Sequence, residues 1–434
     1  MTRSLFGTDG VRGSAGDVLT GELALALGRA SGSLARGRRP RALIIRDTRE
    51  SGPMLEAGLA RGLTQAGVDV ELGGVAPTPA AAIAVRRRGF ELAAVISASH
   101  NPWTDNGIKF FGADGHKLTD EREAEIEARL DIVCQPGRVG TITAADFAAR
   151  GYKAALIARY GALDLRGRRF VLDCAHGAAF RTAPAVFRAL GADVTVIGDQ
   201  PDGRNINEGV GSTHPEAMLA VVAEGGYDAG FAFDGDADRL LACDRDGRLL
   251  DGDDLLVLAA AHLKAEGRLP GNGVAVTLMS NYGVRAALGA AGIELCETPV
   301  GDRYLLAALR EREWALGAEP SGHLIDRNFA PSGDGVSAAL LTLEALAGRD
   351  LADVRPFEKF PQVMRNVVAA RETAAHPDVR VAIDEAQAAL AGRGRVLVRP
   401  SGTEPLVRVM AEAPSVDEAE AVCGALAATV SACG

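Results

Sequence analysis

Three aspartates alternate within one short segment and could together hold a metal ion. Asp234, Asp236 and Asp238 follow the apolar stretch AGFAF, which predicts a buried strand. Alternate residues of an extended backbone point to the same side, so we expect the three carboxylates to converge. Their repulsion would be costly without a hard cation such as Mg²⁺. A calcium-binding EF-hand is excluded, because it needs glycine and glutamate where this chain has Arg239 and Arg245. The alternative is an acidic turn in a solvated loop.

A second polar loop, SASHNP, follows the apolar stretch 92–96 and places hydroxyls beside an imidazole. A serine nucleophile with a histidine base, as in a hydrolase, is one interpretation. Neither serine lies in a G-x-S-x-G elbow, and neighbours in an extended chain point apart, so we expect that His100 cannot simply deprotonate Ser99. A structural serine turn is another interpretation. Lys109 brings a cation near the same loop, which would suit a phosphorylated serine.

Two further loops carry polar groups at the ends of predicted strands. The segment GAEPSGH presents a carboxylate, a hydroxyl and an imidazole from Glu319, Ser321 and His323, which suit the hydroxyls or an amine of a ligand. The segment RPSGTEP combines guanidinium groups, hydroxyls and a glycine turn, which suits a phosphate, although an ordinary Pro/Gly turn is the alternative. Its candidate residues are Arg399, Ser401, Gly402, Thr403 and Arg408. The chain has no Gly-Lys pair and no G-x-G-x-x-G, so a Walker-type nucleotide loop is excluded.

The elements that must position these loops follow a repeated pattern of short β-branched stretches, turns and amphipathic stretches, which predicts βαβ units. We expect an α/β fold with three similar α/β domains around a central cleft, plus a smaller C-terminal α+β domain. The expected domains are 1–150 with the serine loop, 151–250 with the metal-binding loop, 251–361 with the GAEPSGH loop and 362–434 with the phosphate-binding loop.

The predicted strands include 41–46, 68–72, 92–96, 170–173, 194–197, 229–233, 274–279, 293–298, 364–369, 395–399 and 407–412. The predicted helices include 53–66, 79–88, 184–190, 215–223, 304–312, 379–391 and 416–430. We expect the remaining aspartates near the metal-binding loop to be surface hairpin and helix-start residues. They are Asp244, Asp246, Asp251, Asp253 and Asp254.

Composition and charge exclude several classes of protein. The 434 residues carry a formal net charge of −10, so no basic surplus favours nucleic acid or an anionic membrane. Hydrophobic residues make up 47% and charged residues 24%, which excludes wholesale disorder. No apolar run approaches the roughly 20 residues of a membrane span, and the first residues show no apolar stretch typical of a secretory signal, so we expect no export. Six scattered cysteines without a CxxC pair favour reduced thiols, so we expect a cytoplasmic protein.

Taken together, SASHNP, DGDADR, GAEPSGH and RPSGTEP, in this order, resemble the α-D-phosphohexomutase superfamily over the whole chain. Within it, FGTDGVRG, DNGIKFF, the stretch 205–216, TLMSN and VGDRY resemble the bacterial phosphoglucosamine mutase family. This resemblance implies four domains around a central cleft, with the first three related in fold.

The resemblance also implies roles for individual residues. Ser99 would be a phosphoserine that gives and takes back a phosphoryl group, and it would hold one Mg²⁺ together with Asp234, Asp236 and Asp238. The implied residues around the transferring group are Arg12, Lys109, Arg239 and His323, the last as a proton-transfer group or phosphate contact. The implied substrate-binding residues are Glu319, Ser321 and His323 for the sugar end, and Arg399, Ser401, Gly402, Thr403 and Arg408 for the non-reacting phosphate.

The implied reaction interconverts glucosamine 6-phosphate and glucosamine 1-phosphate, a precursor for UDP-N-acetylglucosamine and cell-wall synthesis, with glucosamine 1,6-bisphosphate as intermediate and activator. We expect Lys109 to be the general base, because nearby cations could lower its pKa. Ala318 and Pro320 depart from the G-G-E-Q-S-G-H usual in aminosugar enzymes, so a phosphomannomutase or phosphoglucomutase acting on a neutral hexose is an alternative. A sugar-phosphate-binding protein without turnover is another. The sequence does not decide between a monomer and a homodimer.

Overall fold

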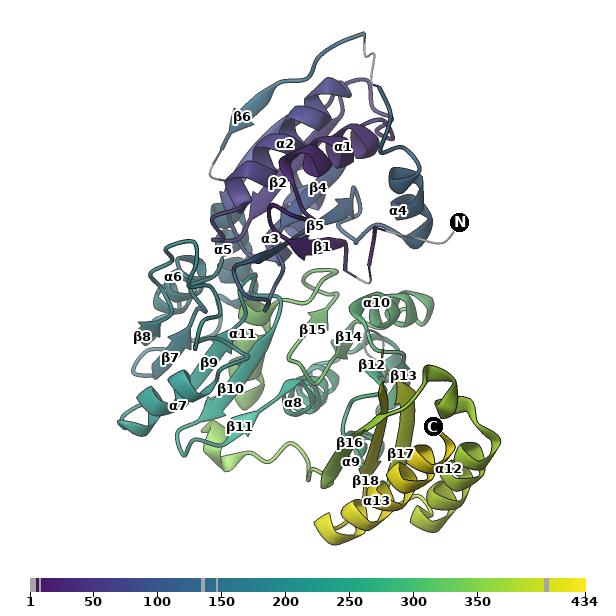
Figure 1. Ribbon diagram of the computed structural model, residues 1–434. Coiled ribbons are helices and arrows are strands. Elements are labelled where there is room, and N and C mark those ends of the chain that lie inside the picture. Colours follow the sequence, from purple (N-terminus) through teal and green to yellow (C-terminus); the bar gives the residue numbers. More distant parts are fainter. Residues whose placement is uncertain (1–4, 8, 134–136, 146, 402–405) are drawn as a thin grey trace. The chain divides into compact units, whose positions relative to one another are not determined.

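The chain forms two compact units in a computed structural model that describes residues 5–7, 9–133, 137–145, 147–401 and 406–434. Unit 1 comprises residues 1–278 and 296–354, and unit 2 comprises residues 279–295 and 355–434. Figure 1 shows both units with their helices and strands labelled. The described residues of unit 1 form three sheets, and those of unit 2 form one.

The first sheet has the strand order β1-β5-β4-β2-β3-β6, in which β2, β3, β4 and β6 pair in parallel and β5 pairs antiparallel with both β4 and β1. Its strands are β1 (Val11–Ser14), β2 (Arg41–Arg46), β3 (Asp69–Val75), β4 (Leu92–Ile96), β5 (Asp105–Gly112) and β6 (Ile142–Ala144). The helices of this region are α1 (Gly21–Gly32), α2 (Gly52–Gln65), α3 (Thr78–Arg88), α4 (Asp120–Glu127) and α5 (Ala148–Tyr160). The central strands β2 and β4 are buried almost throughout, which explains their continuous apolar sequences.

Glycines allow α1 and α2 to pack with their backbones in close approach. A Cβ on Gly28 would lie 2.3 Å from the carbonyl oxygen of Leu59, and a Cβ on Gly62 would lie 2.2 Å from that of Leu25. Neither distance leaves room for a side chain, so this helix pair requires glycine at both positions.

The second sheet has the order β11-β10-β9-β7-β8, with β8, β7 and β9 parallel. Its elements are β7 (Arg169–Asp173), α6 (Thr182–Ala189), β8 (Asp193–Ile197), α7 (Glu216–Ala223), β9 (Ala229–Phe233), β10 (Leu240–Asp244) and β11 (Leu249–Leu250). Phe170, Phe187 and Phe231 form an aromatic cluster at the core, with ring centroids 5.7–5.8 Å apart. Such tilted and edge-on pairs stabilise a core beyond the area that they bury.

The third sheet has the order β13-β12-β14-β15. Its elements are α8 (Gly252–Ala265), the 3-10 turn η1 (Pro270–Asn272), β12 (Gly273–Thr277), β13 (Glu294–Thr298), α10 (Asp302–Glu311), β14 (Leu316–Ala318), β15 (Leu324–Asp326), α11 (Gly335–Leu346) and η2 (Leu351–Asp353). Helix α8 starts with a capping box, in which Asp251 and Asp254 each accept a backbone N–H of the other. Helices α8 and α11 are buried along most of their length, so both are apolar on nearly all sides.

Unit 2 is a small antiparallel sheet with helices. Its strand order is β16-β18-β17. Its elements are α9 (Tyr282–Ala290), β16 (Gln362–Val368), η3 (Arg371–Ala375), α12 (Pro377–Leu390), β17 (Arg395–Pro400), β18 (Leu406–Glu412) and α13 (Val416–Cys433). The segment 279–295 is held to the sheet by the buried Glu412, whose carboxylate accepts the N–H of Tyr282 at 3.2 Å and the Nε–H of Arg395 at 2.5 Å.

The architecture confirms the predicted α/β fold with a smaller C-terminal α+β domain. Strands 41–46, 92–96 and 229–233 have the predicted bounds. The expectation that the neighbouring aspartates lie on the surface was wrong for three of them: Asp244, Asp253 and Asp254 are at most 4% exposed. Hydrogen bonds compensate for this burial. The carboxylate of Asp244, for example, accepts the backbone N–H groups of Asp246 and Arg248 and the Nε–H of the Arg248 side chain.

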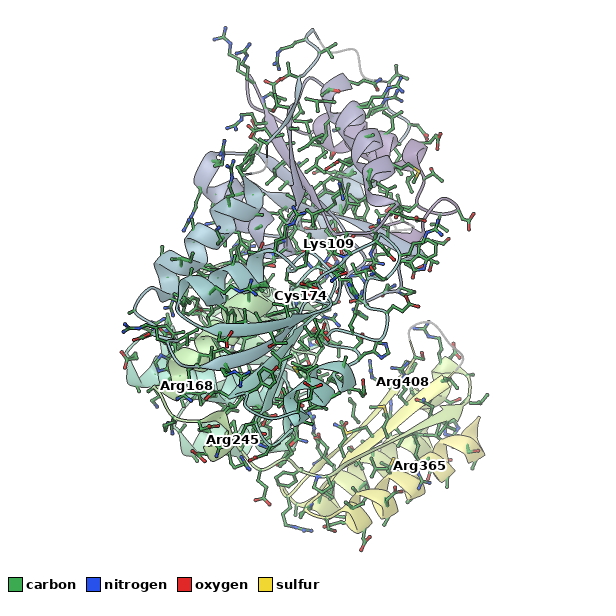
Figure 2. All side chains as sticks on the ribbon, turned by 90° about the vertical axis from the view of Figure 1, so that its left-hand side faces the viewer. Lys109, Arg168, Cys174, Arg245, Arg365 and Arg408 are labelled. Atoms are coloured by element: carbon green, nitrogen blue, oxygen red, sulfur yellow. The ribbon has the colours of Figure 1, made fainter. Side chains whose placement is uncertain are left out.

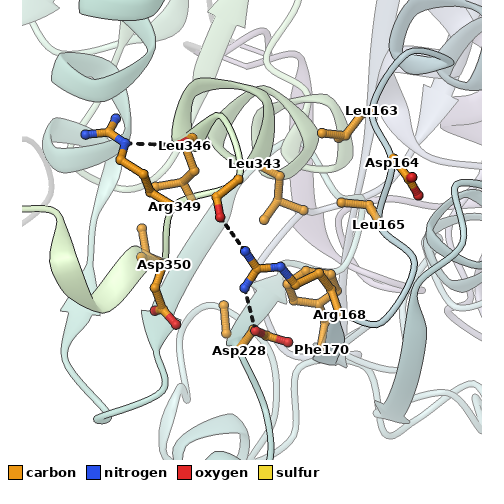
Figure 3. A pocket seen from close by; sticks show the side chains of 13 residues that line it. Leu163, Asp164, Leu165, Arg168, Phe170, Asp228, Leu343, Leu346, Arg349 and Asp350 are labelled. Atoms are coloured by element: carbon orange, nitrogen blue, oxygen red, sulfur yellow. Dashed lines mark hydrogen bonds and ion pairs between the residues drawn. The ribbon is translucent and has the colours of Figure 1, made fainter.

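A small cavity of about 50 Å³ lies between the second sheet and the end of α11 (Figure 3). Arg168 extends along it and donates hydrogen bonds to the Asp228 carboxylate and to the Gly348 carbonyl. This volume holds only one or two water molecules, so the cavity is a packing gap between elements and is too small for a sugar phosphate. Among the described helices, none is long and apolar enough to cross a membrane. The five cysteines that the structure describes are all free thiols.

Candidate active site

Ser99 lies just beyond β4, and its hydroxyl points to the first of the three clustered aspartates. Its Oγ donates a hydrogen bond to Oδ2 of Asp234 at 2.5 Å, and both side chains are buried. Ser99 follows a strand of the first sheet, whereas Asp234 directly follows β9 of the second. The structure therefore brings two distant loops together at the carboxyl ends of strands, where open α/β sheets bind ligands.

Each of the three aspartates places a carboxylate oxygen within 4.8 Å of the others. The carboxylates converge as expected, but the segment is not extended. Ala237 has a φ of +58° and donates its N–H to the carbonyl of Asp234 at 3.0 Å, so a turn directs the side chains together. One oxygen each of Asp236 and Asp238 is buried without a hydrogen-bond partner in the described part of the chain. Such an oxygen cluster fits a divalent cation.

The charges within this cluster depend on their neighbours. Burial, together with the negative charges of Asp238 and Asp236, raises the pKa of Asp234 well above its usual value. Burial would also raise the pKa of Asp238, but Lys109 and His323 hold that pKa well below its usual value. Three carboxylates in a dry site therefore require nearby cations when no metal ion is bound.

Lys109 of β5 lies in the interior of unit 1 (Figure 2). Its Nζ is 2.9 Å from Oδ2 of Asp236, 3.2 Å from Oδ2 of Asp9 and 3.7 Å from Oδ2 of Asp238. Burial alone would lower the pKa of Lys109, but these three carboxylates raise it above its usual value. The expectation that cations lower this pKa was therefore wrong, because carboxylates dominate the surroundings of Lys109. The role of Lys109 as a general base stays a prediction.

Two arginines border the same cluster. Arg12 of β1 pairs with Asp9, and the backbone N–H of Arg239 donates to Oδ1 of Asp234 at 3.2 Å. The Nε of Arg239 also lies 3.8 Å from Oδ1 of Asp238. The Nε atoms of both arginines are buried and lack a hydrogen-bond partner among the described residues. Guanidinium groups with N–H groups to spare suit a bound anion.

His323 reaches the cluster from the loop between β14 and β15. Its Nδ1 lies 3.6 Å from Oδ2 of Asp238, and its Nε2 lies 3.9 Å from Oδ2 of Asp302. Burial disfavours the charged ring, but the two carboxylates raise the pKa of His323 above its usual value. His323 therefore carries positive charge more readily than a free histidine.

His100 corrects the expectation about the serine loop. Its Nδ1 lies 3.3 Å from Oγ of Ser99, because Ser99 has a φ of +53° and the backbone bends instead of extending. Burial, helped by the charges of Arg239 and Arg12, lowers the pKa of His100 to about 4, so the ring is neutral near pH 7. The hydroxyl proton of Ser99 is already donated to Asp234, which separates this arrangement from that of a serine hydrolase.

The GAEPSGH loop is held at the start of α8. The Pro320 carbonyl accepts the N–H of Gly252 at 3.2 Å, where a Cβ would lie 2.0 Å from the carbonyl oxygen of Glu319. The Glu319 carboxylate accepts the N–H of Gly301 at 3.0 Å and lies 3.4 Å from Oγ of Ser321. Both side chains are partly exposed in unit 1. By contrast, Ala318 is completely buried in the core, so its methyl group acts through packing.

The remaining predicted residues belong to unit 2. Arg399 and Arg408 lie directly opposite each other on β17 and β18. Burial and the charge of Arg408 lower the pKa of Arg399. Like charges in opposed positions destabilise a sheet, and an anion would relieve this repulsion. Ser401 is buried next to these strands, whereas Gly402 and Thr403 lie outside the described residues.

Sequence reasoning missed several side chains around the cluster. Thr78 donates its hydroxyl to Oδ2 of Asp236 at 2.6 Å, and Lys117 pairs with both Asp9 and Asp302. Asp9 and Asp302 lie in the quoted motifs FGTDGVRG and VGDRY, so a signal for them existed. Thr78 and Lys117 carry no local signal, because only the tertiary fold brings them to the site.

Comparisons with known proteins agree with this arrangement. Four family models match the chain in order: "Phosphoglucomutase/phosphomannomutase, alpha/beta/alpha" domain I at residues 3–133, domain II at 150–247 and domain III at 251–360, and the C-terminal domain of the same family at 364–429. A phosphoglucosamine mutase of Cereibacter sphaeroides is 48% identical over 425 residues, which cover 95% of each chain. One of Burkholderia vietnamiensis is 48% identical over 440 residues, which cover 96% of each chain.

Solved structures share the fold over almost the whole length. A phosphoglucomutase/phosphomannomutase family protein of Burkholderia thailandensis matches with a TM-score of 0.84 and 25% identity, covering 98% of this chain and 97% of that one. The N-acetylphosphoglucosamine mutase of Aspergillus fumigatus, solved with GlcNAc-6P and magnesium, has the same fold with a TM-score of 0.71 and 18% identity, covering 100% of this chain and 96% of that one. With its relatives matched nearly from end to end, the chain belongs to the phosphoglucosamine mutase family of the phosphoglucomutase/phosphomannomutase superfamily.

Proposed function

We propose that this chain is an isomerase that interconverts glucosamine 6-phosphate and glucosamine 1-phosphate through a phosphoserine at Ser99. The observation that carries the proposal is the contact of Ser99 with a buried cluster of three aspartates that is bordered by cations. Phosphoryl transfer needs in-line positioning and charge neutralisation, and such a site supplies both. The names of the relatives, phosphoglucosamine mutase, support the choice of substrate.

The aspartate cluster fits one Mg²⁺, because two of its buried carboxylate oxygens have no hydrogen-bond partner within the described part of the chain. Asp234, Asp236 and Asp238 would hold the ion together with the phosphate on Ser99. A bound Mg²⁺ supplies positive charge to the phosphoryl oxygens. Lys109, Arg12 and Arg239 supply the remaining positive charge from the chain itself.

The proposed reaction has two halves. In the first, the bond between phosphorus and Oγ of Ser99 breaks, that phosphorus forms a bond to O1 of glucosamine 6-phosphate, and the O1 proton ends on Oγ of Ser99. In the second, the bond between phosphorus and O6 of the resulting 1,6-bisphosphate breaks, that phosphorus forms a bond to Oγ, and the Oγ proton ends on O6. His323, whose Nε2 has no hydrogen-bond partner among the described residues, contacts the phosphate or moves a proton. The bisphosphate also serves as activator, because it can phosphorylate a bare Ser99.

Substrate binding divides between two groups of residues. Glu319 and Ser321 are proposed to contact the sugar. The residues proposed to hold the non-reacting phosphate are Arg399, Ser401, Gly402, Thr403 and Arg408. The opposed pair of arginines on β17 and β18 supports this assignment.

Mass spectrometry tests the proposal at its chemical centre. The mass of the intact protein is measured before and after incubation with glucosamine 1,6-bisphosphate, and the modified peptide is mapped. Turnover of glucosamine 6-phosphate is assayed on the same protein. We expect one added phosphoryl group on Ser99 and activity that is lost in Ser99→Ala. A protein that binds sugar phosphate but never gains phosphate on Ser99 would show the proposal to be wrong.

The same turnover assay distinguishes an enzyme for glucosamine phosphate from one for a neutral hexose phosphate. We expect kcat/KM to be higher for glucosamine 6-phosphate than for glucose 6-phosphate or mannose 6-phosphate. A preference for either neutral sugar would instead assign the chain to phosphoglucomutase or phosphomannomutase activity.

A further inference from the structure

A buried hydrogen-bond network lies directly beneath the Ser99 loop and contains Asp47, Arg49 and Ser97. All three residues have 0% exposure, so the network includes a fully buried ion pair, in which Nε of Arg49 lies 2.9 Å from Oδ2 of Asp47. Asp47 and Arg49 follow β2, and Ser97 follows β4, the neighbouring strand. Burying two charges costs free energy unless hydrogen bonds and opposite charge compensate for the lost water. This cost points to a function of the network.

The network holds the main chain of Ser99 on both sides. The N–H of Ser99 donates to Oγ of Ser97 at 2.9 Å, and its carbonyl accepts from Nη2 of Arg49 at 2.9 Å. The same guanidinium group donates to the carbonyl of Asn101 at 2.8 Å and to that of Pro102. Arg49 therefore binds three carbonyl groups of one loop with its planar fork.

Asp47 joins these contacts into one unit. Ser97 donates its hydroxyl proton to Oδ2 of Asp47 at 2.6 Å, and Nε of Arg49 donates to the same oxygen. Since the single hydroxyl proton of Ser97 is used, its oxygen can only accept from Ser99. The direction of the two hydrogen bonds that Ser97 makes, to Asp47 and from the Ser99 N–H, is thus determined.

Ser99 needs this support because its conformation is unfavourable. A φ of +53° lies in the left-handed region, which residues with a side chain rarely adopt. In this conformation Oγ of Ser99 reaches Oδ2 of Asp234. A relaxed backbone with negative φ would turn the hydroxyl away from the aspartate cluster.

We propose that Arg49, together with Asp47 and Ser97, is a positioning unit that holds Ser99 in its left-handed conformation, so that Oγ is aligned for transfer in both half-reactions. The inference rests on the proposed function, because it concerns the phosphoserine. Arg49 contacts the loop and not the substrate, so it acts on the phosphoryl-transfer step and leaves sugar binding unchanged.

Arg49→Lys tests the unit, since it keeps the charge but cannot bind three carbonyl groups at once. The matched control is Arg327→Lys, because Arg327 donates to the carbonyls of Leu309 and Trp314, which belong to no part of the site. Steady-state turnover is measured together with the rate at which glucosamine 1,6-bisphosphate phosphorylates Ser99. We expect Arg49→Lys to lose about 100-fold in both rates, the loss typical of a misplaced reacting group, with KM unchanged. Rates are divided by the fraction of folded protein, so a loss of folded protein alone does not count.

Ser97→Ala is the milder variant and settles the outcome if Arg49→Lys does not fold. It removes the acceptor of the Ser99 N–H and the hydroxyl that donates to Asp47, but it leaves the contacts of Arg49 with the loop in place. A lower phosphorylation rate is therefore expected, while Mg²⁺ affinity measured by calorimetry stays at the wild-type value. A variant that folds and phosphorylates Ser99 at the wild-type rate would overturn the positioning role. A loss of rate matched by Arg327→Lys, or a change in KM alone, would overturn it too. If the wild-type protein itself gains no phosphate on Ser99, the proposed function fails instead, so the two failures are distinguishable.

Discussion

Individual side chains at the site are paired so that each buried charge meets an opposite charge or a hydrogen bond. Lys109 lies among three carboxylates, and His100 remains neutral because arginines and burial lower its pKa. The same pattern of pairing extends beneath the loop that carries Asp234, Asp236 and Asp238. There, Asp334 caps α11, and the N–H of Gly335 donates to the carbonyl of Ala237 at 3.0 Å. A substitution of Asp334 therefore affects the backbone next to the aspartate cluster.

Asp334→Asn should change how stability depends on pH. Burial raises the pKa of Asp334 to about 7, so between about pH 4 and 7 the folded state holds a proton that the unfolded chain has released. Wild-type stability therefore falls as pH rises through this window, by an amount on the order of 4 kcal/mol if the full shift is realised. Asparagine also caps helices but does not titrate.

The measurement is Tm by calorimetry from pH 5 to 8. We expect the Tm of Asp334→Asn relative to wild type to rise with pH and then level off above about pH 7. Asp164→Asn is the control, because that exposed carboxyl has a pKa of about 2 and titrates below the window. A constant difference between Asp334→Asn and wild type would contradict the prediction.

Secondary-structure elements are brought close to one another at a few points where glycine is required. The pair α1 and α2 packs through Gly28 and Gly62, and the aspartate loop contacts the loop after β7 at Gly177. A Cβ on Gly177 would lie 2.3 Å from the carbonyl oxygen of Gly235. The loop after β7 also donates the N–H of Ala178 to that carbonyl at 2.8 Å. Backbone contacts of this kind hold the aspartate loop without using its side chains.

Gly62→Ala should destabilise unit 1, although alanine favours a helix over glycine by about 1 kcal/mol. The new Cβ would lie 2.2 Å from the Leu25 carbonyl oxygen, so α1 and α2 must separate at a cost of roughly 1–3 kcal/mol. Gly151→Ala in α5 is the matched control, since no atom lies within 4 Å of its added Cβ. Thermal unfolding should show opposite shifts in Tm for the two variants. Equal shifts would mean that the helix contact does not limit stability.

The whole molecule places the two groups of proposed site residues in different compact units. The aspartate cluster, Ser99 and the surrounding cations all belong to unit 1, whereas the opposed arginines on β17 and β18 belong to unit 2. Both units derive from segments that are not continuous in sequence, because residues 279–295 join unit 2. A substitution of an arginine in unit 2 should thus weaken substrate binding and leave the contacts around Ser99 in unit 1 intact.

Arg399→Gln should weaken substrate binding without destabilising unit 2. A charge-assisted hydrogen bond contributes about 1.5–3 kcal/mol, so we expect kcat/KM to fall by roughly 10- to 100-fold. The repulsion between Arg399 and Arg408 is removed at the same time, so Tm should be unchanged or higher. Steady-state kinetics and thermal unfolding of the same preparation check both effects. A lower Tm with unchanged kinetics would assign this arginine pair a structural role.

Local patterns in the sequence determine much of this protein. Continuous apolar stretches predict β2, β4 and β9 because buried parallel strands need apolar side chains on both faces. The loops after them contain the candidate residues Ser99, Asp234, Asp236 and Asp238, because ligand sites lie at strand ends. These are properties of short segments, and short segments are visible in a sequence.

Only the tertiary structure decides which distant groups meet. The carboxylates of Asp9, Asp236 and Asp238 surround Lys109 and raise its pKa, although the sequence predicted the opposite shift. The sequence likewise did not predict the bend at Ser99 or the buried Arg49 beneath it. Electrostatic interactions and hydrogen bonds depend on distance in space, and burial strengthens them by removing water. The sequence by itself therefore determined the loops and the family resemblance, while the fold decided the charge of each group and the conformation of the reacting serine.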